Sequence, residues 1–307
     1  MKKGYLLVLS AGIAWGSAGV ISSMLMDVGL SPFEVAWLRG AIALLVLFPI
    51  ILLKEGGFPK IALPDLRFFI VFGLINFALF NIFYFKAIDL VGATMAVILL
   101  YMAPAFAVLF GYLFCNEPFT KGKIVAVILS ILGCFLVVKG YELASLRLNL
   151  PGVLAGLGSG ITYSLYGIFG KKAGKRYPAL TTVFYCTLFG TLYLTIVVPP
   201  WQIAPNPAGM KFWLGAVGLG LWCSVAPWLA YNIGVRMVEA SRAAVVASIE
   251  AVVGVALAVI FLGEALELLQ VLGVLLVLVA VICAQAKETG SGNAHDEPAS
   301  LPVLGQK

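Results

Sequence analysis

Charged side chains are scarce in this sequence of 307 residues, because only 11% are Asp, Glu, Lys or Arg while 62% are hydrophobic. A water-soluble domain carries about 25% charged residues, and a chain of this length cannot bury such an apolar excess. Histidine is nearly absent, since His295 stands alone in a polar C-terminal stretch. The five cysteines lack the spacing of metal ligands or of a disulfide framework. These shortages exclude a soluble domain and leave the apolar part without histidine for catalysis or zinc binding, so we expect no metal site and no catalytic residues.

Long hydrophobic blocks take the place of the missing charge. Each is about 18–22 residues long, which is enough to cross a hydrocarbon layer of ~30 Å as an α-helix. We therefore expect an all-α polytopic membrane protein with ten transmembrane helices. The predicted spans are residues 4–26, 33–53, 67–85, 93–115, 122–139, 151–170, 180–198, 212–235, 242–262 and 268–286.

The loops between these blocks carry most of the basic residues, which accounts for the net charge of +6 without nucleic acid as a partner. Positive charge stays on the cytoplasmic side of a membrane protein. With a cytoplasmic N-terminus and ten crossings, fifteen of the twenty Lys and Arg residues fall inside and four outside. We therefore expect a protein of the cytoplasmic (inner) membrane with both termini in the cytoplasm. The polar tail, residues 287–307, is expected to be a disordered cytoplasmic segment.

An internal duplication is visible when the sequence is shifted by 147 residues. Tyr84 then aligns with Tyr231, and Glu117 aligns with Glu264 at the end of an apolar block. Five spans per half is an odd number, so the second half enters the membrane in the opposite orientation. Such 5+5 inverted repeats are typical of secondary transporters, which bind a substrate between the halves.

Several segments resemble the drug/metabolite transporter superfamily, in particular its EamA-domain members. The quoted motifs are AGIAWGS (11–17), EVAWLRGAIALL (34–45), FKAIDLVGATMAVILLYMAPAFAVLFGYLFCNEP (85–118) and SRAAVVASIEAVVGVALAVIFLGEAL (241–266). The resemblance implies two EamA-like five-helix repeats, residues 4–140 and 150–286, and transport of small organic metabolites. It also implies amino acids or related compounds as the substrate class. Ala251 departs from the pattern, because members often have proline there, so we expect a straighter ninth span.

Two charged residues lie deep within predicted spans, where a charge costs about 2.5–3.5 kcal/mol. Glu250 is eight residues into its span, roughly 12 Å deep. It is a candidate proton carrier or partner for a substrate amine, or else a buried structural glutamate. For Arg39 we favour a structural role, such as pairing with Glu34, over attraction of a carboxylate or phosphate.

Uncharged polar and aromatic residues recur within the spans and must find partners or line a wet cavity. Such a lining suits an amphiphilic metabolite, although each residue taken alone is better explained as interhelical contact or as an interfacial residue such as Tyr231. Pro104 and Pro227 are expected to kink helices beside this cavity. The candidates are Trp15, Asn76, Asn81, Tyr84, Tyr101, Tyr163, Tyr166, Trp228, Asn232, Ser248 and Glu250, with Arg39 as a charge partner.

The functional expectation is a secondary transporter that exports amino acids or related compounds by alternating access. Its partners are a small-molecule substrate, the lipid bilayer and protons as a coupling ion. No GxxxxGK[ST] motif is present, so we expect no ATP hydrolysis and no cofactor. Carriers of sugars, nucleotide-type metabolites or cationic drugs remain alternatives. A membrane-embedded enzyme is disfavoured because the spans contain no histidine.

Overall fold

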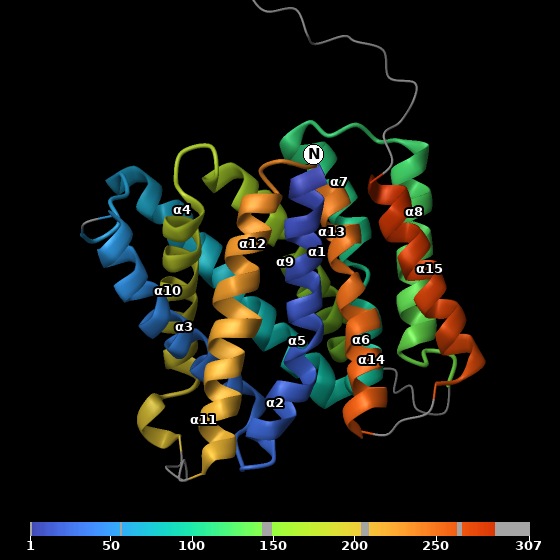
Figure 1. Cartoon of the computed structure of the whole chain (residues 1–307), viewed down its shortest axis with the longest axis horizontal. Helices are drawn as coiled ribbons and strands as arrows, with labels where there is room; N and C mark the ends of the chain where they lie inside the picture. Colours follow the sequence, from blue (N-terminus) through green and yellow to red (C-terminus); the bar gives the residue numbers. More distant parts are fainter. Residues whose placement is uncertain (1, 56, 143–148, 204–208, 263–265, 286–307) are drawn as a thin grey trace, which may run out of the picture.

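Helices form nearly all of the secondary structure in the described part of the chain, which contains no β-strand (Figure 1). This computed structural model describes residues 2–55, 57–142, 149–203, 209–262 and 266–285. The tail at 287–307 and Glu264 lie outside the described residues.

The first half of the chain contains eight α-helices and one π-helical segment. These elements are α1 (Lys2–Gly16), α2 (Ala18–Met26), α3 (Pro32–Glu55), α4 (Leu63–Gly73), η1 (Leu74–Leu79), α5 (Phe80–Val91), α6 (Ala93–Leu100), α7 (Ala103–Cys115) and α8 (Lys121–Val137).

The second half contains seven α-helices, one π-helical segment and one short 3₁₀ turn. Its elements are α9 (Leu150–Ala173), α10 (Ala179–Val197), η3 (Pro200–Gln202), α11 (Met210–Val217), η4 (Gly218–Val225), α12 (Ala226–Gly234), α13 (Ala240–Ala247), α14 (Ile249–Leu262) and α15 (Leu268–Gln285).

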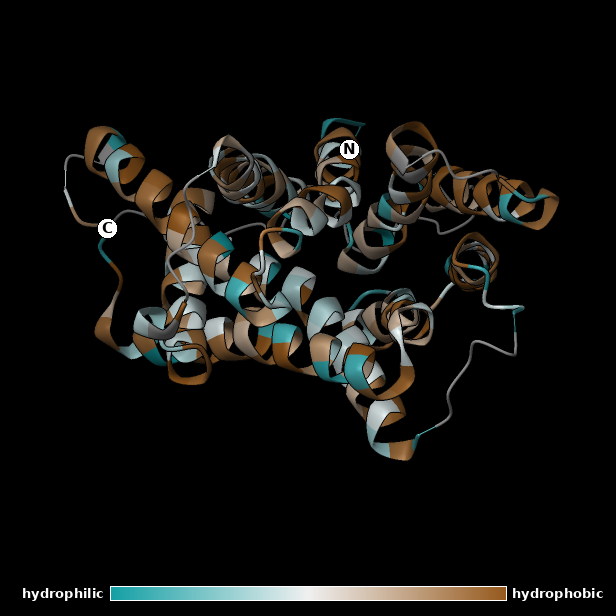
Figure 2. Ribbon diagram, turned by 90° about the horizontal axis from the view of Figure 1, so that it is seen from below, coloured by the Kyte–Doolittle hydropathy of each residue, from teal (hydrophilic) through white to brown (hydrophobic). Residues whose placement is uncertain are grey.

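Nine stretches of the described chain are long and apolar enough to cross a membrane, so the expectation of a multi-pass, all-helical protein is confirmed. The fifth predicted span is α8, which has 17 residues and is shorter than the others. It packs along α15. Large apolar side chains on the outside of the helices, such as Leu45 at 74% exposure and Ile196 at 78%, would not face water in a soluble protein. Hydrophilic ribbon is confined to short segments (Figure 2).

Helix interruptions occur at corresponding places in the two halves. The π-helical segments η1 and η4 lie in the third and eighth predicted spans. The breaks between α6 and α7 at Tyr101 and between α13 and α14 at Ser248 are 147 residues apart. The expectation that Ala251 leaves the ninth span straighter is therefore wrong. The amides of Ser248 and Ala251 bond to carbonyls three residues earlier, which tightens the turn without a proline.

Close helix contacts at glycine also recur between the halves. A Cβ added to Gly73 would lie 2.7 Å from the backbone nitrogen of Gly190, and one added to Gly220 would lie 3.5 Å from that of Ala43. Gly220 lies 147 residues after Gly73, and Gly190 lies 147 residues after Ala43, so the two contacts correspond. Two further contact pairs match at offsets of 147 or 148, namely Gly4 on Val238 with Gly152 on Val91, and Gly12 on Ala247 with Gly160 on Leu100.

These contacts interleave the two halves of the chain. The start of α1 packs on the segment after α12, whereas the start of α9 packs on the end of α5. The N-terminus and the end of α15 lie on one side of the bundle, together with the turn between α7 and α8 (Figure 1). Gly152, Gly156 and Gly160 all approach neighbouring helices closely, so α9 packs tightly along this stripe.

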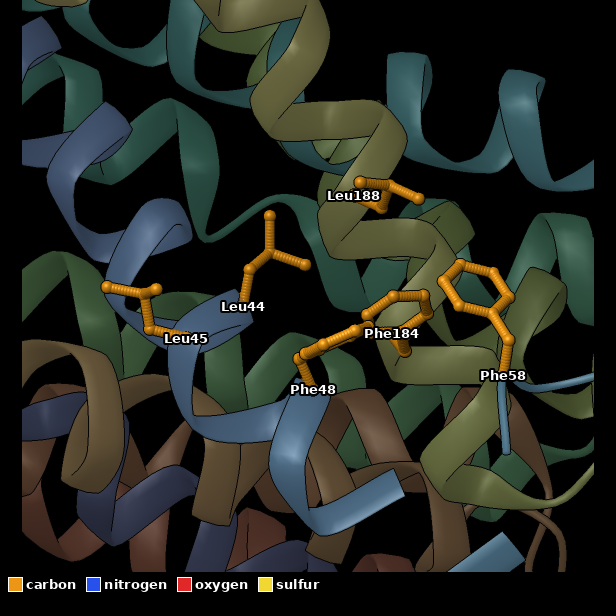
Figure 3. A pocket seen from close by; sticks show the side chains of 6 residues that line it. All are labelled: Leu44, Leu45, Phe48, Phe58, Phe184 and Leu188. Atoms are coloured by element: carbon orange, nitrogen blue, oxygen red, sulfur yellow. The ribbon is translucent and has the colours of Figure 1, made fainter. Parts of the chain in front are cut away.

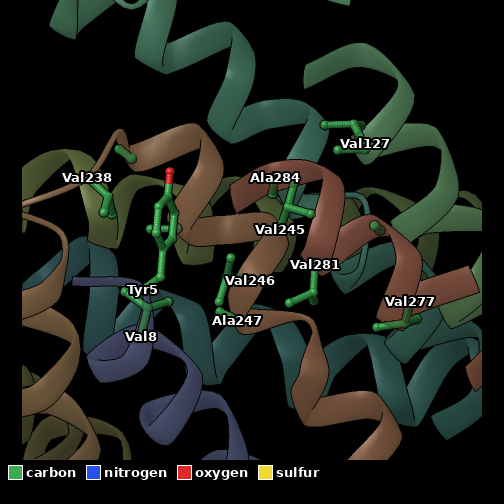
Figure 4. Close-up of a cluster of buried hydrophobic side chains, with 14 of the residues drawn as sticks. Tyr5, Val8, Val127, Val238, Val245, Val246, Ala247, Val277, Val281 and Ala284 are labelled. Atoms are coloured by element: carbon green, nitrogen blue, oxygen red, sulfur yellow. The ribbon is translucent and has the colours of Figure 1, made fainter. Parts of the chain in front are cut away.

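The largest buried cluster joins both ends of the chain to its middle. It places Tyr5 and Val8 of α1 against Val245 and Val246 of α13 and the small residues of α15 (Figure 4). Because lipid is as apolar as these side chains, their association depends on close packing of the helices rather than on exclusion of water.

Gly73 provides a test of this packing. We expect Gly73→Val to destabilise the protein by about 1–3 kcal/mol, because its side chain would meet the backbone of α10. The melting temperature of the purified protein in detergent measures the effect. Gly19→Val is the matched control, since a Cβ there meets no atom within 4 Å. Equal melting temperatures for the two variants would contradict the contact.

Candidate functional site

Glu250 lies at the first turn of α14, immediately after the break at Ser248. Its Oε2 accepts a hydrogen bond of 3.3 Å from the hydroxyl of Tyr163 on α9. No ion pair among the described residues includes Glu250, and its side chain is only half-buried. The helix break thus presents a carboxylate with spare acceptor capacity toward α9.

Aromatic rings adjoin Tyr163, the partner of this carboxylate. The ring of Trp15 lies 6.2 Å from that of Tyr163 and 5.3 Å from that of Tyr231. Phe80 lies between Tyr163 and Tyr84, and Tyr101 packs on the same buried cluster as Trp15 and Tyr231. We call the set of Trp15, Tyr84, Tyr101, Tyr163, Tyr231 and Glu250 the acidic subsite. Most of its members are half-buried, so the cluster retains accessible surface.

Arg39 projects from α3 at a second place in the bundle. Its guanidinium carbon lies 5.3 Å from the ring of Trp228 and 5.8 Å from that of Phe77. The expected pairing with Glu34 is wrong, because Glu34 accepts a hydrogen bond from the amide of Ser31 at the start of α3 instead. Among the described residues Arg39 has no ion pair, and its Nε is buried without an acceptor.

Asparagine side chains hold the neighbouring helices in place. The amide of Asn232 donates to the hydroxyl of Tyr166 at 2.7 Å and to the carbonyl of Trp228 at 2.9 Å. Asn76 donates to the carbonyl of Thr162 on α9. In both asparagines the Oδ1 atom is buried and has no donor, which leaves two acceptors available inside the bundle.

The rings of Tyr166 and Tyr231, which are tilted against each other with centroids 5.5 Å apart, connect the surroundings of Arg39 to the acidic subsite. Two predicted lining residues serve the scaffold. Ser248 is buried and forms a 2.7 Å hydrogen bond with Ser130 of α8, and Asn81 donates to the carbonyl of Phe77 in its own helix.

Sequence reasoning underrated Tyr231 and missed Phe77. Tyr231 was expected at the membrane interface, but it is 5% exposed and contacts Trp15. Its alignment with Tyr84 at an offset of 147 residues was an available signal. Phe77 lies in η1 and looks like any other apolar residue of its span, so only the fold reveals its contact with Arg39.

An apolar hollow of about 320 Å³ lies apart from these polar residues, between α3 and α10 (Figure 3). Its lining is Leu44, Leu45, Phe48, Phe58, Phe184 and Leu188. Several of these side chains are exposed on the outside of the bundle. The hollow therefore suits a lipid chain and offers no group that would bind a polar compound.

Glu117 links three helices on the side of the bundle that carries the N-terminus. The carboxylate is buried and accepts hydrogen bonds from the amides of Ala240 and Ser241, at 2.7 and 3.2 Å, and from the Ser241 hydroxyl. It thereby caps the N-terminus of α13, where a negative charge is favourable. Lys171 at the end of α9 contributes an ion pair of 2.9 Å.

The chain turns sharply to bring Glu117 into this position. Asn116 adopts the left-handed conformation with φ of 53°, which ends α7. Gly111 leaves room for the carboxylate, since a Cβ there would lie 2.7 Å from its Oε2. This geometry lets Glu117 anchor the turn between α7 and α8 to α9 and α13.

Burial alone raises the pKa of Glu117, but the hydrogen bond from Ser241, the charge of Lys171 and the amide of Ala240 outweigh it and hold the pKa below its ordinary value. As the pH falls, Glu117 is therefore protonated in the unfolded chain before it is protonated in the folded protein. The stabilisation that its carboxylate provides decreases over this range and is lost as the pH falls through the folded-state pKa.

We expect Glu117→Gln to lower stability at neutral pH by about 3–5 kcal/mol, because it breaks a buried ion pair. The wild type should lose stability on acidification below about pH 5, whereas the variant should lose less. Melting temperatures between pH 4 and 8 measure both effects. Glu142→Gln, on the exposed segment after α8, is the control. A variant as stable as the wild type at pH 7 would contradict the anchoring role.

The chain belongs to the EamA-like transporter family, whose sequence profile matches residues 2–139 and again residues 150–284. The expected family is thus confirmed over almost the whole described chain.

Curated relatives carry matching names. The chain is 28% identical over 282 residues to an uncharacterized transporter of Archaeoglobus fulgidus, covering 91% of this chain and 94% of that protein. It is 23% identical to an uncharacterized inner membrane transporter of Salmonella typhimurium, covering 92% and 94%. A solved crystal structure matches with a TM-score of 0.77 at 19% identity, covering 92% of this chain and 97% of the other, which establishes a shared fold.

Proposed function

We propose that this protein is a secondary transporter that exports amino acids or related small organic compounds by alternating access. The observation that carries the proposal is Glu250, a carboxylate without an ion-pair partner among the described residues, at a helix break inside a ring of aromatic side chains. Membership of a transporter family supports movement of a compound across the membrane.

The chemistry of the acidic subsite suits a substrate ammonium group. A carboxylate offers charge-assisted hydrogen bonds, and the faces of tryptophan and tyrosine attract cations. Glu250 is also a candidate proton carrier, because a substrate ammonium and a proton would compete for the same oxygens. Competition of this kind would drive export with a proton entering in exchange.

The architecture that we propose is ten spans in a 5+5 inverted repeat. The recurring helix interruptions and the three matched glycine contacts support it, as do the two stretches that match the family profile. Two interleaved halves of opposite direction can exchange roles across the membrane, which provides an outward- and an inward-facing state from one set of contacts.

Charge supports a cytoplasmic location for both termini in the cytoplasmic membrane. The side of the bundle with the N-terminus carries Lys171, Lys175 and Arg242 (Figure 1), and positive residues are retained on the cytoplasmic side.

Cationic organic compounds, including drugs, are the second candidate class, because the acidic subsite alone would accept any amine. Sugars and nucleotide-type metabolites do not use a carboxylate in this way. An enzymatic role is not part of the proposal: in the described part of the chain no three His, Cys, Asp or Glu side chains gather as a metal-binding group.

We expect Glu250→Gln to reduce transport of amine-bearing compounds at least about tenfold, since hydrogen bonds to charged groups contribute about 1.5–3 kcal/mol. Flux in proteoliposomes, with and without a pH gradient, measures the effect. The gradient should cease to drive flux in the variant.

Glu142→Gln is the matched control, because it removes an exposed carboxylate far along the chain from the acidic subsite. Unchanged flux and an unchanged pH profile in Glu250→Gln would rule out both roles assigned to this residue.

Orientation can be tested with single cysteines in a cysteine-free background. Both Lys175 and Glu142 are exposed, at turns on opposite sides of the bundle. A membrane-impermeant maleimide applied to intact cells should label Glu142→Cys and should reach Lys175→Cys only after permeabilisation. The reverse pattern would contradict cytoplasmic termini.

A further inference from the structure

Arg39 is a charged residue whose guanidinium finds no hydrogen-bond acceptor in the described part of the protein. Its guanidinium touches the rings of Phe77 and Trp228, yet no hydrogen bond or ion pair among the described residues includes it. Cation–π contacts satisfy the face of a guanidinium, whereas its N–H groups in the plane still require acceptors. An isolated charge within a span is costly, so this geometry calls for an acceptor from outside the protein.

Other buried polar atoms of neighbouring spans are also unpaired. The Oδ1 atoms of Asn76 and Asn232 lack donors, while their amides donate to the carbonyls of Thr162 and Trp228. The buried hydroxyl of Thr191 also lacks a partner. It lies beside the Phe77 ring, because a Cβ added to Gly40 would meet both groups. Buried polar groups in a protein core nearly always have hydrogen-bond partners. Several unpaired polar groups are therefore typical of a binding site.

Glu250 is not the counter-ion of Arg39. Arg39 contacts the rings of Phe77 and Trp228, whereas Glu250 accepts a hydrogen bond from Tyr163. The two sets of contacts share no member, and the neighbouring rings of Tyr166 and Tyr231, which are tilted against each other, lie between them. The bundle therefore contains a negative and a positive group at two ends of one aromatic path.

The repeat indicates that neither charge is needed for folding. At the offset of 147 residues that relates the glycine contacts, Arg39 corresponds to Cys186 and Glu250 to Ala103. Both counterparts are buried, small and uncharged. Because the matching positions of the scaffold pack without a charge, the charges on one side have a different purpose.

We propose that Arg39 forms an oxyanion subsite, so that the transported compound is bipolar, with its ammonium group at Glu250 and a carboxylate or phosphate at Arg39. This inference rests on the proposed function. Arginine is suited to the role because its planar N–H groups bind such oxyanions in pairs. Since Arg39 and Glu250 contact different residues, with the rings of Tyr166 and Tyr231 between them, the compound should carry its charges several bonds apart, as ω-amino acids do, rather than on adjacent carbons.

Thermal stabilisation of the purified full-length protein by a series of defined compounds tests this inference. The bipolar series is glycine, 4-aminobutanoate, 6-aminohexanoate and 8-aminooctanoate. Hexylamine lacks the oxyanion, and 6-aminohexyl phosphate replaces the carboxylate. The proteins are the wild type, Arg39→Lys, Arg39→Met and Glu250→Gln.

In the wild type we expect the longer members to bind at least about tenfold more tightly than glycine. Arg39→Met should weaken 6-aminohexanoate at least about tenfold and leave hexylamine unchanged, which also shows that the variant is folded. Arg39→Lys should lie between the two, because lysine keeps the charge without the paired N–H geometry. Glu250→Gln should weaken both compounds. Stronger Arg39-dependent binding of the phosphate compound would identify phosphate as the oxyanion.

Three results would overturn the inference: equal binding of 6-aminohexanoate by Arg39→Met and the wild type, equal binding of glycine and the longer members, or no stabilisation of the wild type by any bipolar compound. Flux in proteoliposomes separates this inference from the proposed function. Arg39-dependent binding without flux would refute transport and keep the oxyanion subsite, whereas flux that Arg39→Met leaves unchanged would refute the subsite alone.

Discussion

The structure depends on close backbone contacts at glycines, through which helices of one half of the chain pack on helices of the other half. The start of α1 packs on the segment after α12, and α9 packs on α5 and α6. Within lipid, no gain from burying apolar surface drives helices together, so the contact area that small residues allow becomes decisive. Each half therefore completes the packing of the other, and the bundle forms from both at once.

The proposed repeat relates these contacts to one another, but the two intramembrane charges do not follow it. At the offset of 147 residues Arg39 and Glu250 correspond to a cysteine and an alanine. In the proposed transport cycle a symmetric frame would supply two related states, and the unpaired charges would select what is bound between them. Scaffold and recognition are thus carried by different residues of the same helices.

Interrupted helices connect the scaffold to the candidate site. The break at Ser248 places Glu250 at the first turn of α14, and the hydrogen bond between the hydroxyls of Ser130 and Ser248 holds that break against α8. On the side with the N-terminus, Glu117 ties α13 to α9 through Ser241 and Lys171. The short helix α13 is therefore held at both ends, with the acidic subsite adjoining one of them.

The helical, multi-pass character and the family followed from the sequence, because hydropathy and motifs are local properties of the chain. The sequence also identified Glu250 and Arg39 as charges within spans, but it did not show which residues contact one another. A proline at position 251 would have signalled the break at Ser248, which forms without one, and Glu34 was a plausible partner for Arg39 until the fold bound it to Ser31. Composition thus determined that the chain enters lipid as helices, whereas only tertiary packing decided which polar groups meet and which remain unpaired, since many of those contacts join residues far apart in the sequence.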